Sequence, residues 1–494
     1  MNFQSTRDKN KTKYTSAQVI KQGLADDGGL FVPENIPQIT LDDISRYCTL
    51  PYPELAADIL SKYLTDYTYN ELLCDCEKAY SKESFPNGAC RTVKVNDNTY
   101  SLELWHGPTC AFKDMALQIM PRLLSRALKK TNETKTSLIL VATSGDTGKA
   151  ALEGYKDIDG IKICVFFPEN GVSTIQKLQM TTQSGANVNV CGVNGNFDDI
   201  QTAVKSIFSD ESIVKELSDK GYTLSSANSI NFGRLAPQIV YYFKAYCDLI
   251  NRDSITLGDK VNICVPTGNF GNILAAYIAK LMGLPVNKLI CASNSNNVLT
   301  EFLRTGTYNR HRPFRVTMSP SMDILISSNL ERLLYLICGS EKTAGYMKSL
   351  NETGCYKIDT DTLAQINSDF MGYYSDEYTT MRTVQIVHDD YGYLIDTHTG
   401  VAFSALGQYR QETSDNTVSI IASTANPSKF AKDVHDAIYD DVYLTDIEAF
   451  YRLEKLSHEP IPLPLKDLDQ KEVRFKRVID PDGMYSEIKR FINE

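Results

Sequence analysis

Strand-like and helix-like segments alternate through the middle of the chain, and this alternation constrains the fold more than any other feature of the sequence. Between Thr99 and about Ser293, short runs rich in Val, Ile and Leu are separated by polar turns and by stretches of helical length. The strand-like runs are SLELW, SLILV, IKICVFF, NVNVCG, YTLSS, NICVP and KLICAS. Strands that alternate with helices form right-handed βαβ units and therefore parallel sheets. The sequence thus predicts an α/β fold whose ligands bind at the carboxyl ends of the strands.

The remaining segments predict the domain organisation. The first 90 residues have mostly helical patterns, and the segment FPNGAC at their end is typical of a boundary loop. Residues 320–390 have a helical pattern, and VSIIAST followed by ANPSKFAKDV predicts one more strand and helix. We expect an N-terminal domain over 1–90 and a catalytic region over 91–494, comprising a smaller α/β part of about 99–230, a larger one of about 231–440 and a C-terminal extension of about 441–494.

Composition excludes some kinds of partner. The net charge is −10, so a nucleic acid bound through basic patches is not an expected partner. The N-terminus lacks the apolar run of a secretory signal, and no apolar run is long enough to span a bilayer, so we expect a cytoplasmic protein without membrane contact. Most of the twelve cysteines lie in apolar runs, as buried reduced thiols do. Cys74 and Cys76 have no second ligand pair nearby, so we expect no metal site.

The segment LELWHGPTCAFKD places a lysine where a reactive amine is useful. A strand-like run ends in a Gly-Pro turn, and Lys113 follows at the start of an apolar segment with helical spacing. Burial and the positive end of a helix both favour the neutral form of lysine, which is a nucleophile and a proton acceptor. Alternatively, Lys113 and Asp114 form a solvated pair in the first turn of a surface helix. His106, beside the turn, is expected to make structural hydrogen bonds only.

The segment ATSGDTG predicts a polar turn between the strand-like run SLILV and a helix. Such a turn lies at the carboxyl end of its strand, where its hydroxyl and N–H groups can bind an anionic group. In an ordinary βα loop, Ser144 or Asp146 would instead cap the helix. A P-loop is excluded, because its pattern requires a glycine where Thr143 stands.

The segment VPTGNFGN predicts a third turn of this kind, Gly268–Asn272, which precedes a helical pattern ending near Lys280. Its two glycines let the backbone approach an anion closely, and we expect them to adopt conformations that other residues do not reach easily. The turn lacks the spacing of a dinucleotide fingerprint, which favours a single phosphate as its ligand. Three polar turns that each follow a strand can converge at one edge of a sheet.

These motifs together resemble those of threonine synthases, a family of pyridoxal-phosphate enzymes of fold type II. The matching segments follow the family's order and cover nearly the whole chain: GLADDGGLFVPENIP, LELWHGPTCAFKD, ATSGDTG, SSANSINFGRLAPQ, PTGNFGN, DTHTGVAF and ASTANPSKF. The SGDTG loop is similar to that of the longer fungal and proteobacterial subgroup. The resemblance implies two parallel-sheet α/β domains with pyridoxal 5′-phosphate in the cleft between them, and a mostly helical N-terminal domain.

The resemblance also implies roles for individual residues. Lys113 bonds to the cofactor, the glycine-bearing turn holds the cofactor phosphate, and a threonine hydroxyl faces the pyridine nitrogen. The implied cofactor-binding residues are Lys113, Gly268, Asn269, Phe270, Gly271, Asn272 and Thr424. The implied substrate-binding residues are Ser144, Asp146 and Thr147, near the substrate carboxylate or the cofactor, and Asn231 and Arg234, at the substrate phosphate. Arg234 could instead be an exposed helix residue.

The implied reaction converts O-phospho-L-homoserine and water into L-threonine and phosphate, in a monomer or homodimer. Lys113 removes the Cα proton and moves protons among Cα, Cβ and Cγ, phosphate leaves from Cγ, and water adds to Cβ. A related phospho-lyase would retain every cofactor residue and differ only in the shape of its pocket. A serine or threonine dehydratase is expected to carry an SGNHG-like loop in place of SGDTG. A non-enzymatic binding protein with this fold would have lost the lysine.

Overall fold

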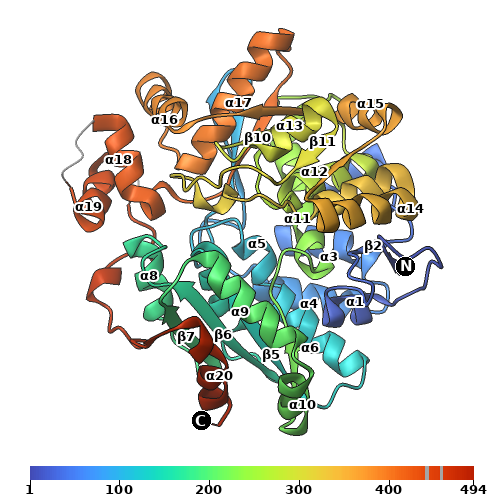
Figure 1. Cartoon of the computed structure of the whole chain (residues 1–494). Coiled ribbons are helices and arrows are strands. Elements are labelled where there is room, and N and C mark those ends of the chain that lie inside the picture. Colours follow the sequence, from blue (N-terminus) through green and yellow to red (C-terminus); the bar gives the residue numbers. More distant parts are fainter. Residues whose placement is uncertain (440–443, 457–459, 494) are drawn as a thin grey trace.

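Two β-sheets, each covered by helices, form the body of the molecule (Figure 1). The structure is a computed structural model that describes residues 1–439, 444–456 and 460–493. One sheet has the strand order β13-β10-β9-β14-β4-β3 and is parallel except for β3, which is antiparallel to β4. The other has the order β15-β7-β6-β5-β8 and is entirely parallel. The predicted α/β fold with parallel sheets is therefore confirmed.

Most strands of the two sheets lie close to the runs that the sequence predicts. The first sheet contains β3 (Arg91–Asn96), β4 (Thr99–Glu103), β9 (Val261–Pro266), β10 (Val286–Ser293), β13 (Phe370–Tyr374) and β14 (Ser419–Ser423). The second contains β5 (Thr136–Ala142), β6 (Ile161–Pro168), β7 (Val188–Val193), β8 (Tyr222–Ser225) and β15 (Val478–Ile479). Two antiparallel pairs lie outside these sheets, β1 (Phe3–Ser5) with β2 (Phe31–Pro33) and β11 (Thr307–Asn309) with β12 (Cys355–Lys357).

The helices follow in chain order. Those before β8 are α1 (Ser16–Gln22), α2 (Leu41–Tyr47), α3 (Tyr52–Tyr63), α4 (Tyr69–Ala79), α5 (Asp114–Leu117), α6 (Met120–Lys130), α7 (Asp146–Tyr155), α8 (Thr174–Thr181), α9 (Phe197–Ser209) and α10 (Glu211–Asp219). Those after β8 are α11 (Phe232–Asn251), α12 (Gly271–Met282), α13 (Val298–Thr305), α14 (Leu330–Thr353), α15 (Thr360–Asp369), α16 (Glu377–Tyr391), α17 (Thr397–Thr413), α18 (Ala431–Tyr439), α19 (Asp446–Leu456) and α20 (Met484–Asn493). Short 3₁₀ turns include η1 (Pro320–Met322), η2 (Pro427–Phe430), η3 (Leu468–Gln470) and η4 (Pro481–Gly483).

Both faces of the central strands are buried, which explains their largely apolar sequences. In β9, Ile263 and Val265 belong to the largest hydrophobic core, which also contains residues of α11 and α12. Cys264, between them, belongs to a second core with residues of α17. Because helices cover both faces, most positions of this strand are apolar, and the buried exception, Asn262, donates a hydrogen bond to Asp415 Oδ2 at 2.9 Å.

The N-terminal region contains α1 to α4, as its helical patterns predict, and also the short pair β1 and β2. Ile20 of α1, Leu60 of α3 and Leu72 of α4 belong to the same core as Leu123 of α6 and Leu235 of α11. The N-terminal helices therefore pack on the catalytic region and share its interior. None of the described helices is long and apolar enough to cross a membrane.

Several strands differ from the prediction. Residues 320–390 are not helical throughout, because β12 and β13 lie among them, and β13 forms an edge of the first sheet. Strand β4, which we assigned to the smaller α/β part, pairs with β14 in the first sheet. Strand β15, in the C-terminal extension, pairs with β7 in the second sheet. Strands that pair in a sheet are distant in the chain, so the local sequence does not determine which strands pair. The domain boundaries stay a prediction.

Candidate active site

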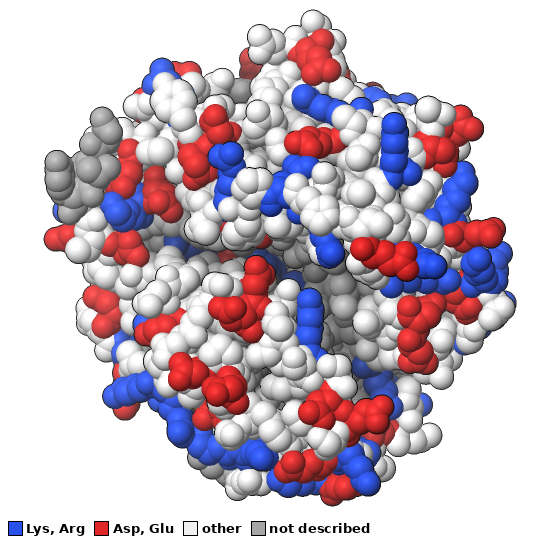
Figure 2. All heavy atoms as spheres, in the orientation of Figure 1, with Lys and Arg blue, Asp and Glu red and all other residues white. Residues whose placement is uncertain are grey.

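Polar segments that follow β4, β14 and β5 meet between the two sheets. The peptide N–H of Phe112, after β4, donates to the carbonyl oxygen of Thr424, after β14, at 2.8 Å. Lys113 Nζ lies 3.9 Å from Asp146 Oδ2, which follows β5 in the other sheet. The face in Figure 2 is hollowed along the boundary between the two sheet regions, with lysine or arginine atoms visible inside the hollow. The turns converge at the carboxyl ends of strands, as predicted, but they come from two sheets and not from one edge of a single sheet.

Lys113 lies at the N-terminal end of α5 with little contact with water. It is 8% exposed, and its Nζ donates a hydrogen bond to Ser321 Oγ at 3.1 Å. Burial lowers the pKa of Lys113 to about 8, because the attraction of Asp146 only partly offsets the loss of water. Asp114 is fully buried and accepts hydrogen bonds from the peptide N–H and the hydroxyl of Thr109. The alternative of a solvated surface pair is therefore wrong.

Asp146 is held in the site by a second buried lysine. Lys429, which is fully buried in η2, lies 2.7 Å from Asp146 Oδ1 and donates to the carbonyl oxygen of Thr109 at 2.9 Å. Gln176 Nε2 donates to the same carboxylate at 2.9 Å. Burial opposes ionisation of Asp146, but the Lys429 and Lys113 ammonium groups outweigh it, so the pKa of Asp146 lies well below its usual range. Asp146 is therefore a fixed negative charge beside Lys113.

The SGDTG turn leaves two hydroxyl groups free. The helix α7 is capped by Thr143 Oγ1, which accepts from the N–H groups of Gly145 and Gly148 at 3.0 and 2.8 Å. Neither Ser144 nor Asp146 caps the helix, so the ordinary βα-loop alternative is wrong in this detail. The hydroxyls of Ser144 and Thr147 have no hydrogen-bond partner in the described part of the chain, and both residues are half-buried. These hydroxyls remain able to bind a ligand.

The Gly268–Asn272 turn presents free hydrogen-bond donors at the start of α12. The first N–H groups of a helix have no acceptor inside the helix, and no side chain of the described residues accepts from those of Gly271, Asn272 or Ile273. Asn272 Oδ1 accepts from the Tyr241 hydroxyl at 2.7 Å, whereas its buried Nδ2 has no partner. A turn with these donors suits a phosphate group.

The conformational role expected of the two glycines is wrong. Neither Gly268 nor Gly271 has a positive φ, whereas Phe270 between them adopts the left-handed conformation with φ 61° and ψ 4°. Gly268 is required for space: a Cβ there would lie 2.8 Å from the Ser321 carbonyl oxygen. A Cβ at Gly271 would lie 3.5 Å from Asn329 Nδ2, which is an ordinary contact. The sequence identifies the turn correctly, but backbone angles do not follow from glycine positions alone.

This difference predicts unequal effects of two matched substitutions. Gly268→Ala should weaken retention of pyridoxal phosphate, the cofactor that the resemblance implies, by at least about tenfold, or about 1.4 kcal/mol, because the added methyl group displaces the turn from the backbone of Ser321. Gly271→Ala, the matched control, should bind the cofactor more tightly than Gly268→Ala does. Equilibrium dialysis of both apo proteins against pyridoxal phosphate measures the affinities. Equal affinities would show that crowding at Gly268 does not set the shape of the turn.

Arg234 is a buried cation without an ion-pair partner among the described residues. It is 4% exposed, so the alternative of an exposed helix residue is wrong. One guanidinium nitrogen donates to the Ala227 carbonyl oxygen at 2.8 Å, while the buried Nε has no partner. Burial lowers the pKa of Arg234 to about 10, and its charge lies near enough to lower the pKa of Lys113 as well. An unpaired buried guanidinium indicates an anionic ligand.

Asn231 has a structural role that the sequence does not reveal. Its Oδ1 caps α11 by accepting from the Gly233 N–H at 2.9 Å, and its Nδ2 donates to the Ile20 carbonyl oxygen in α1 at 2.8 Å. The residue thus joins the N-terminal helices to the start of α11, where Arg234 lies. Substrate contact by Asn231 remains a prediction, and only one of its N–H bonds is left for it.

Thr424 and His106 differ in the hydrogen bonds that they form. Thr424 is 6% exposed, and its hydroxyl forms no hydrogen bond with the described residues. His106 Nε2 lies 2.8 Å from Glu103 Oε2, and its ring packs on Trp105 at 4.3 Å between centroids. Thr424 is thus available to a ligand, whereas His106 is bound to the protein.

Sequence reasoning missed the segment that closes the site. Ser321, in η1, contacts Lys113, and its peptide N–H donates to His398 Nε2 at 3.2 Å. His398 and Lys429 both lie in segments that carry the family resemblance, DTHTGVAF and ASTANPSKF, and this was the only signal for them. No spacing in the sequence relates Ser321 to Lys113, because the two residues are 208 positions apart.

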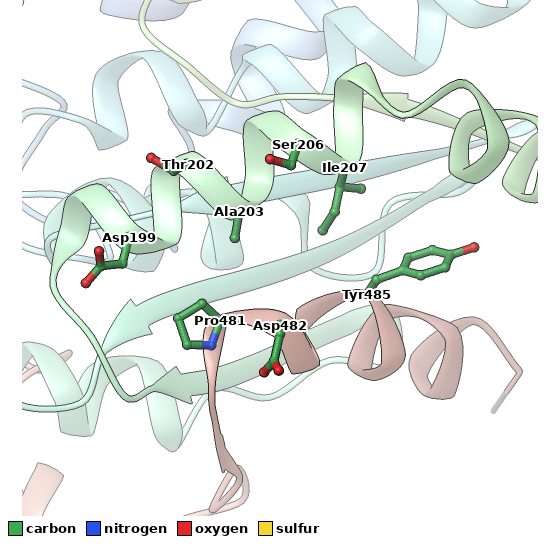
Figure 3. A pocket seen from close by; sticks show the side chains of 8 residues that line it. All are labelled: Asp199, Thr202, Ala203, Ser206, Ile207, Pro481, Asp482 and Tyr485. Atoms are coloured by element: carbon green, nitrogen blue, oxygen red, sulfur yellow. The ribbon is translucent and has the colours of Figure 1, made fainter.

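A second opening lies away from these residues. It has a volume of about 470 Å³ and separates α9 from the segment η4–α20 (Figure 3). Its lining residues are Asp199, Thr202, Ala203, Ser206, Ile207, Pro481, Asp482 and Tyr485. This lining contains two carboxylates and no cation, so it does not suit an anionic cofactor or substrate.

Comparisons with known proteins point to one family. Family models described as "Threonine synthase N terminus", "Pyridoxal-phosphate dependent enzyme" and "Threonine synthase, C-terminal" match residues 2–80, 94–424 and 399–492. The human protein "Threonine synthase-like 1" is 40% identical over 442 residues, which cover 86% of this chain but only 58% of that protein. The threonine synthase of Eremothecium gossypii is 34% identical over 512 residues, covering 97% of this chain and 95% of that one. The structure of pyridoxal-phosphate-bound threonine synthase from Brucella melitensis has a TM-score of 0.88 and 34% identity, with 100% of each chain covered.

Proposed function

Because this chain belongs to the threonine synthase family of pyridoxal-phosphate-dependent enzymes, we propose that it converts O-phospho-L-homoserine and water into L-threonine and inorganic phosphate. The observation that carries this proposal is the unpaired, buried Arg234 beside Lys113. A lysine with a lowered pKa suits proton transfer, and a guanidinium without a carboxylate partner suits a phosphorylated substrate. The phosphate-binding turn at α12 then remains for the cofactor.

The free groups of the site fit pyridoxal phosphate. The amine of Lys113 is the group that bonds to the cofactor aldehyde, and the N–H groups of the Gly268–Asn272 turn, with Asn272 Nδ2, are donors for its phosphate. The Thr424 hydroxyl is available to the pyridine nitrogen and supplies no charge there. When bound, the cofactor supplies an electron sink for the charge left at Cα of the substrate.

Lys113 carries the proton transfers in this proposal. With a pKa of about 8, it is partly neutral near pH 7.5 and can both accept and return a proton. It takes the proton from Cα and moves protons among Cα, Cβ and Cγ, so that phosphate leaves from Cγ and water adds to Cβ. Asp146 stabilises the ammonium form of Lys113 each time the lysine holds a proton.

The remaining polar groups position the substrate. The planar guanidinium of Arg234 provides paired donors for the substrate phosphate, and the Ser144 and Thr147 hydroxyls provide donors for the substrate carboxylate. Asp146 itself is occupied by Lys429 and Gln176, so we propose that it acts through its charge and by holding the turn. Asn231 is proposed to fix the start of α11, and any contact with substrate uses its remaining N–H bond.

We also propose that the protein acts in the cytoplasm as a monomer or homodimer. All twelve cysteines are free, and eight of them are buried, which supports a reducing compartment. The alternative function is that of a phospho-lyase, which shares every cofactor residue and releases phosphate without forming threonine. A dehydratase is less favoured, because SGDTG differs from its expected loop.

Product analysis tests the proposed function. The purified protein loaded with pyridoxal phosphate is incubated with O-phospho-L-homoserine, and the products are quantified by chromatography and a phosphate assay. We expect threonine and phosphate in equal amounts. Phosphate accompanied by 2-oxobutanoate in place of threonine would identify the phospho-lyase instead.

A further inference from the structure

The turn around Ser321 closes the site over Lys113. Ser321 Oγ is the only acceptor of a hydrogen bond from Lys113 Nζ among the described residues, at 3.1 Å. The carbonyl oxygen of the same serine lies where a Cβ on Gly268 would approach it to 2.8 Å. One residue therefore touches both the reactive amine and the phosphate-binding turn.

A buried histidine–aspartate pair fixes this turn. His398 and Asp396 are 2% and 0% exposed, and His398 Nδ1 lies 2.7 Å from Asp396 Oδ2. Asp396 also caps α17 by accepting from the N–H groups of His398 and Thr399 at 3.0 and 3.2 Å. The carboxylate is thus locked at the helix N-terminus, and the ring orientation follows from it.

The hydrogen bonds define which ring nitrogen carries the proton. The Ser321 peptide N–H is a donor, so His398 Nε2 accepts and bears no hydrogen. Nδ1 therefore carries the proton and donates to Asp396. In this form the ring offers one fixed acceptor to the Ser321 turn, whereas a proton on Nε2 would oppose the Ser321 N–H.

The other end of the turn is anchored independently. Asp323 Oδ1 accepts from Asn294 Nδ2 at 2.8 Å, from Asn296 Nδ2 at 2.9 Å and from the Thr317 hydroxyl at 2.7 Å. The turn is therefore held on both sides, by His398 at the start of α17 and by Asp323 in the residues that follow the turn itself. An ordinary surface loop does not need buried hydrogen bonds on both of its sides.

We infer that Ser321 is a catalytic residue that holds the free Lys113 amine in place through its hydroxyl, and that His398 and Asp396 are the residues that position it. This inference rests on the proposed role of Lys113 in proton transfer. When Lys113 gains a proton, the Ser321 hydroxyl accepts one of the ammonium N–H bonds and thereby favours the protonated form. The motif DTHTG thus has the role of positioning Ser321, which its sequence does not reveal.

The test uses capture of pyridoxal phosphate by the apo protein, which needs no substrate. Only the neutral amine attacks the cofactor aldehyde. The rate at which the visible absorption band forms therefore rises with pH as Lys113 loses its proton. Ser321→Ala removes the acceptor, so the midpoint of this rise should move to lower pH by about half a unit or more. The charged groups facing Lys113, which are Asp146, Asp114, Arg234 and Lys429, are unchanged in this variant.

Two further comparisons separate positioning from general damage. Ser319→Ala is the matched control, because Ser319 lies on the same turn and bonds to Asn294 and Thr317 but not to Lys113. Its midpoint should equal that of the unmodified protein. His398→Leu should shift the midpoint as Ser321→Ala does, and His398→Gln, which keeps an acceptor near Nε2, should restore it. Thermal unfolding of each variant verifies that it is folded.

The result of this pH measurement does not depend on the result of the product assay that tests the proposed function. An unchanged midpoint in folded Ser321→Ala, or an equal shift in Ser319→Ala, would overturn the inference. A midpoint shift confined to the Ser321 and His398 variants would support it, whichever products the enzyme forms. A failure of the threonine assay would therefore leave this result interpretable.

Discussion

Replacement of Lys113 by alanine is expected to abolish the visible absorption band of the cofactor-loaded protein and to lower turnover by about a thousandfold or more. Lys113 Nζ is the buried amine that lies beside Asp146 and Ser321, where the carboxyl ends of strands from both sheets meet. Without this amine the cofactor has no lysine to bond, and no base remains for the Cα proton. Absorption spectra and steady-state assays of the purified variant measure both effects.

Lys149 provides a matched control for this substitution. It is 8% exposed, the same fraction as Lys113, but it pairs with Glu153 at 2.9 Å within α7. Lys149→Met should lower the thermal stability while retaining the visible band. If Lys113→Ala kept an unchanged band and Lys149→Met lost it, Lys149 and not Lys113 would be the lysine that bonds to the cofactor.

Replacement of Arg234 by alanine should cost about 2 to 4 kcal/mol of transition-state stabilisation, measured as the decrease in kcat/KM for O-phospho-L-homoserine. The guanidinium is buried, its Nε has no partner, and no carboxylate of the described residues neutralises it. Its loss therefore removes a partner of the substrate phosphate without breaking an ion pair of the protein. The cofactor content should stay normal.

Arg234→Lys distinguishes charge from geometry at the same position. A lysine keeps the charge but not the planar fork, so we expect a smaller loss than in the alanine variant. Wild-type kcat/KM in Arg234→Ala would show that another cation binds the substrate phosphate. A large loss of cofactor in that variant would instead assign Arg234 to the cofactor phosphate.

The strands and the polar turns after them could be predicted from the sequence, because each is a local signal. Largely apolar runs such as NICVP mark strands buried on both faces, and a glycine-bearing turn after such a run marks the edge where ligands bind. The turn before Lys113 indicates this lysine as a candidate in the same way, although the local sequence alone leaves a solvated surface pair open as the alternative. Strand β13 was missed because its five residues, FMGYY, lie between helical patterns and carry no turn signal of their own.

The contacts that tune the site could not be predicted, because they join distant parts of the chain. Lys429 neutralises Asp146, and Ser321 contacts Lys113, through pairings that only the folded sheets bring together. Neighbouring polar residues also compete to cap a helix, and the sequence does not show which of them does so. Thr143, one residue before SGDTG, caps α7 in place of Ser144. Likewise Phe270, and not a neighbouring glycine, adopts the left-handed conformation.

The reaction in water enriched in ¹⁸O tests most directly the claim that this protein forms threonine by loss of phosphate and addition of water. If phosphate leaves from Cγ and water adds to Cβ, the label enters the hydroxyl group of threonine, and the released phosphate carries none. Mass spectrometry of both products measures the label, and Lys113→Ala should form neither product. Labelled phosphate with homoserine as the other product would show hydrolysis at phosphorus, and would contradict the account in which Lys113 and the cofactor carry the chemistry.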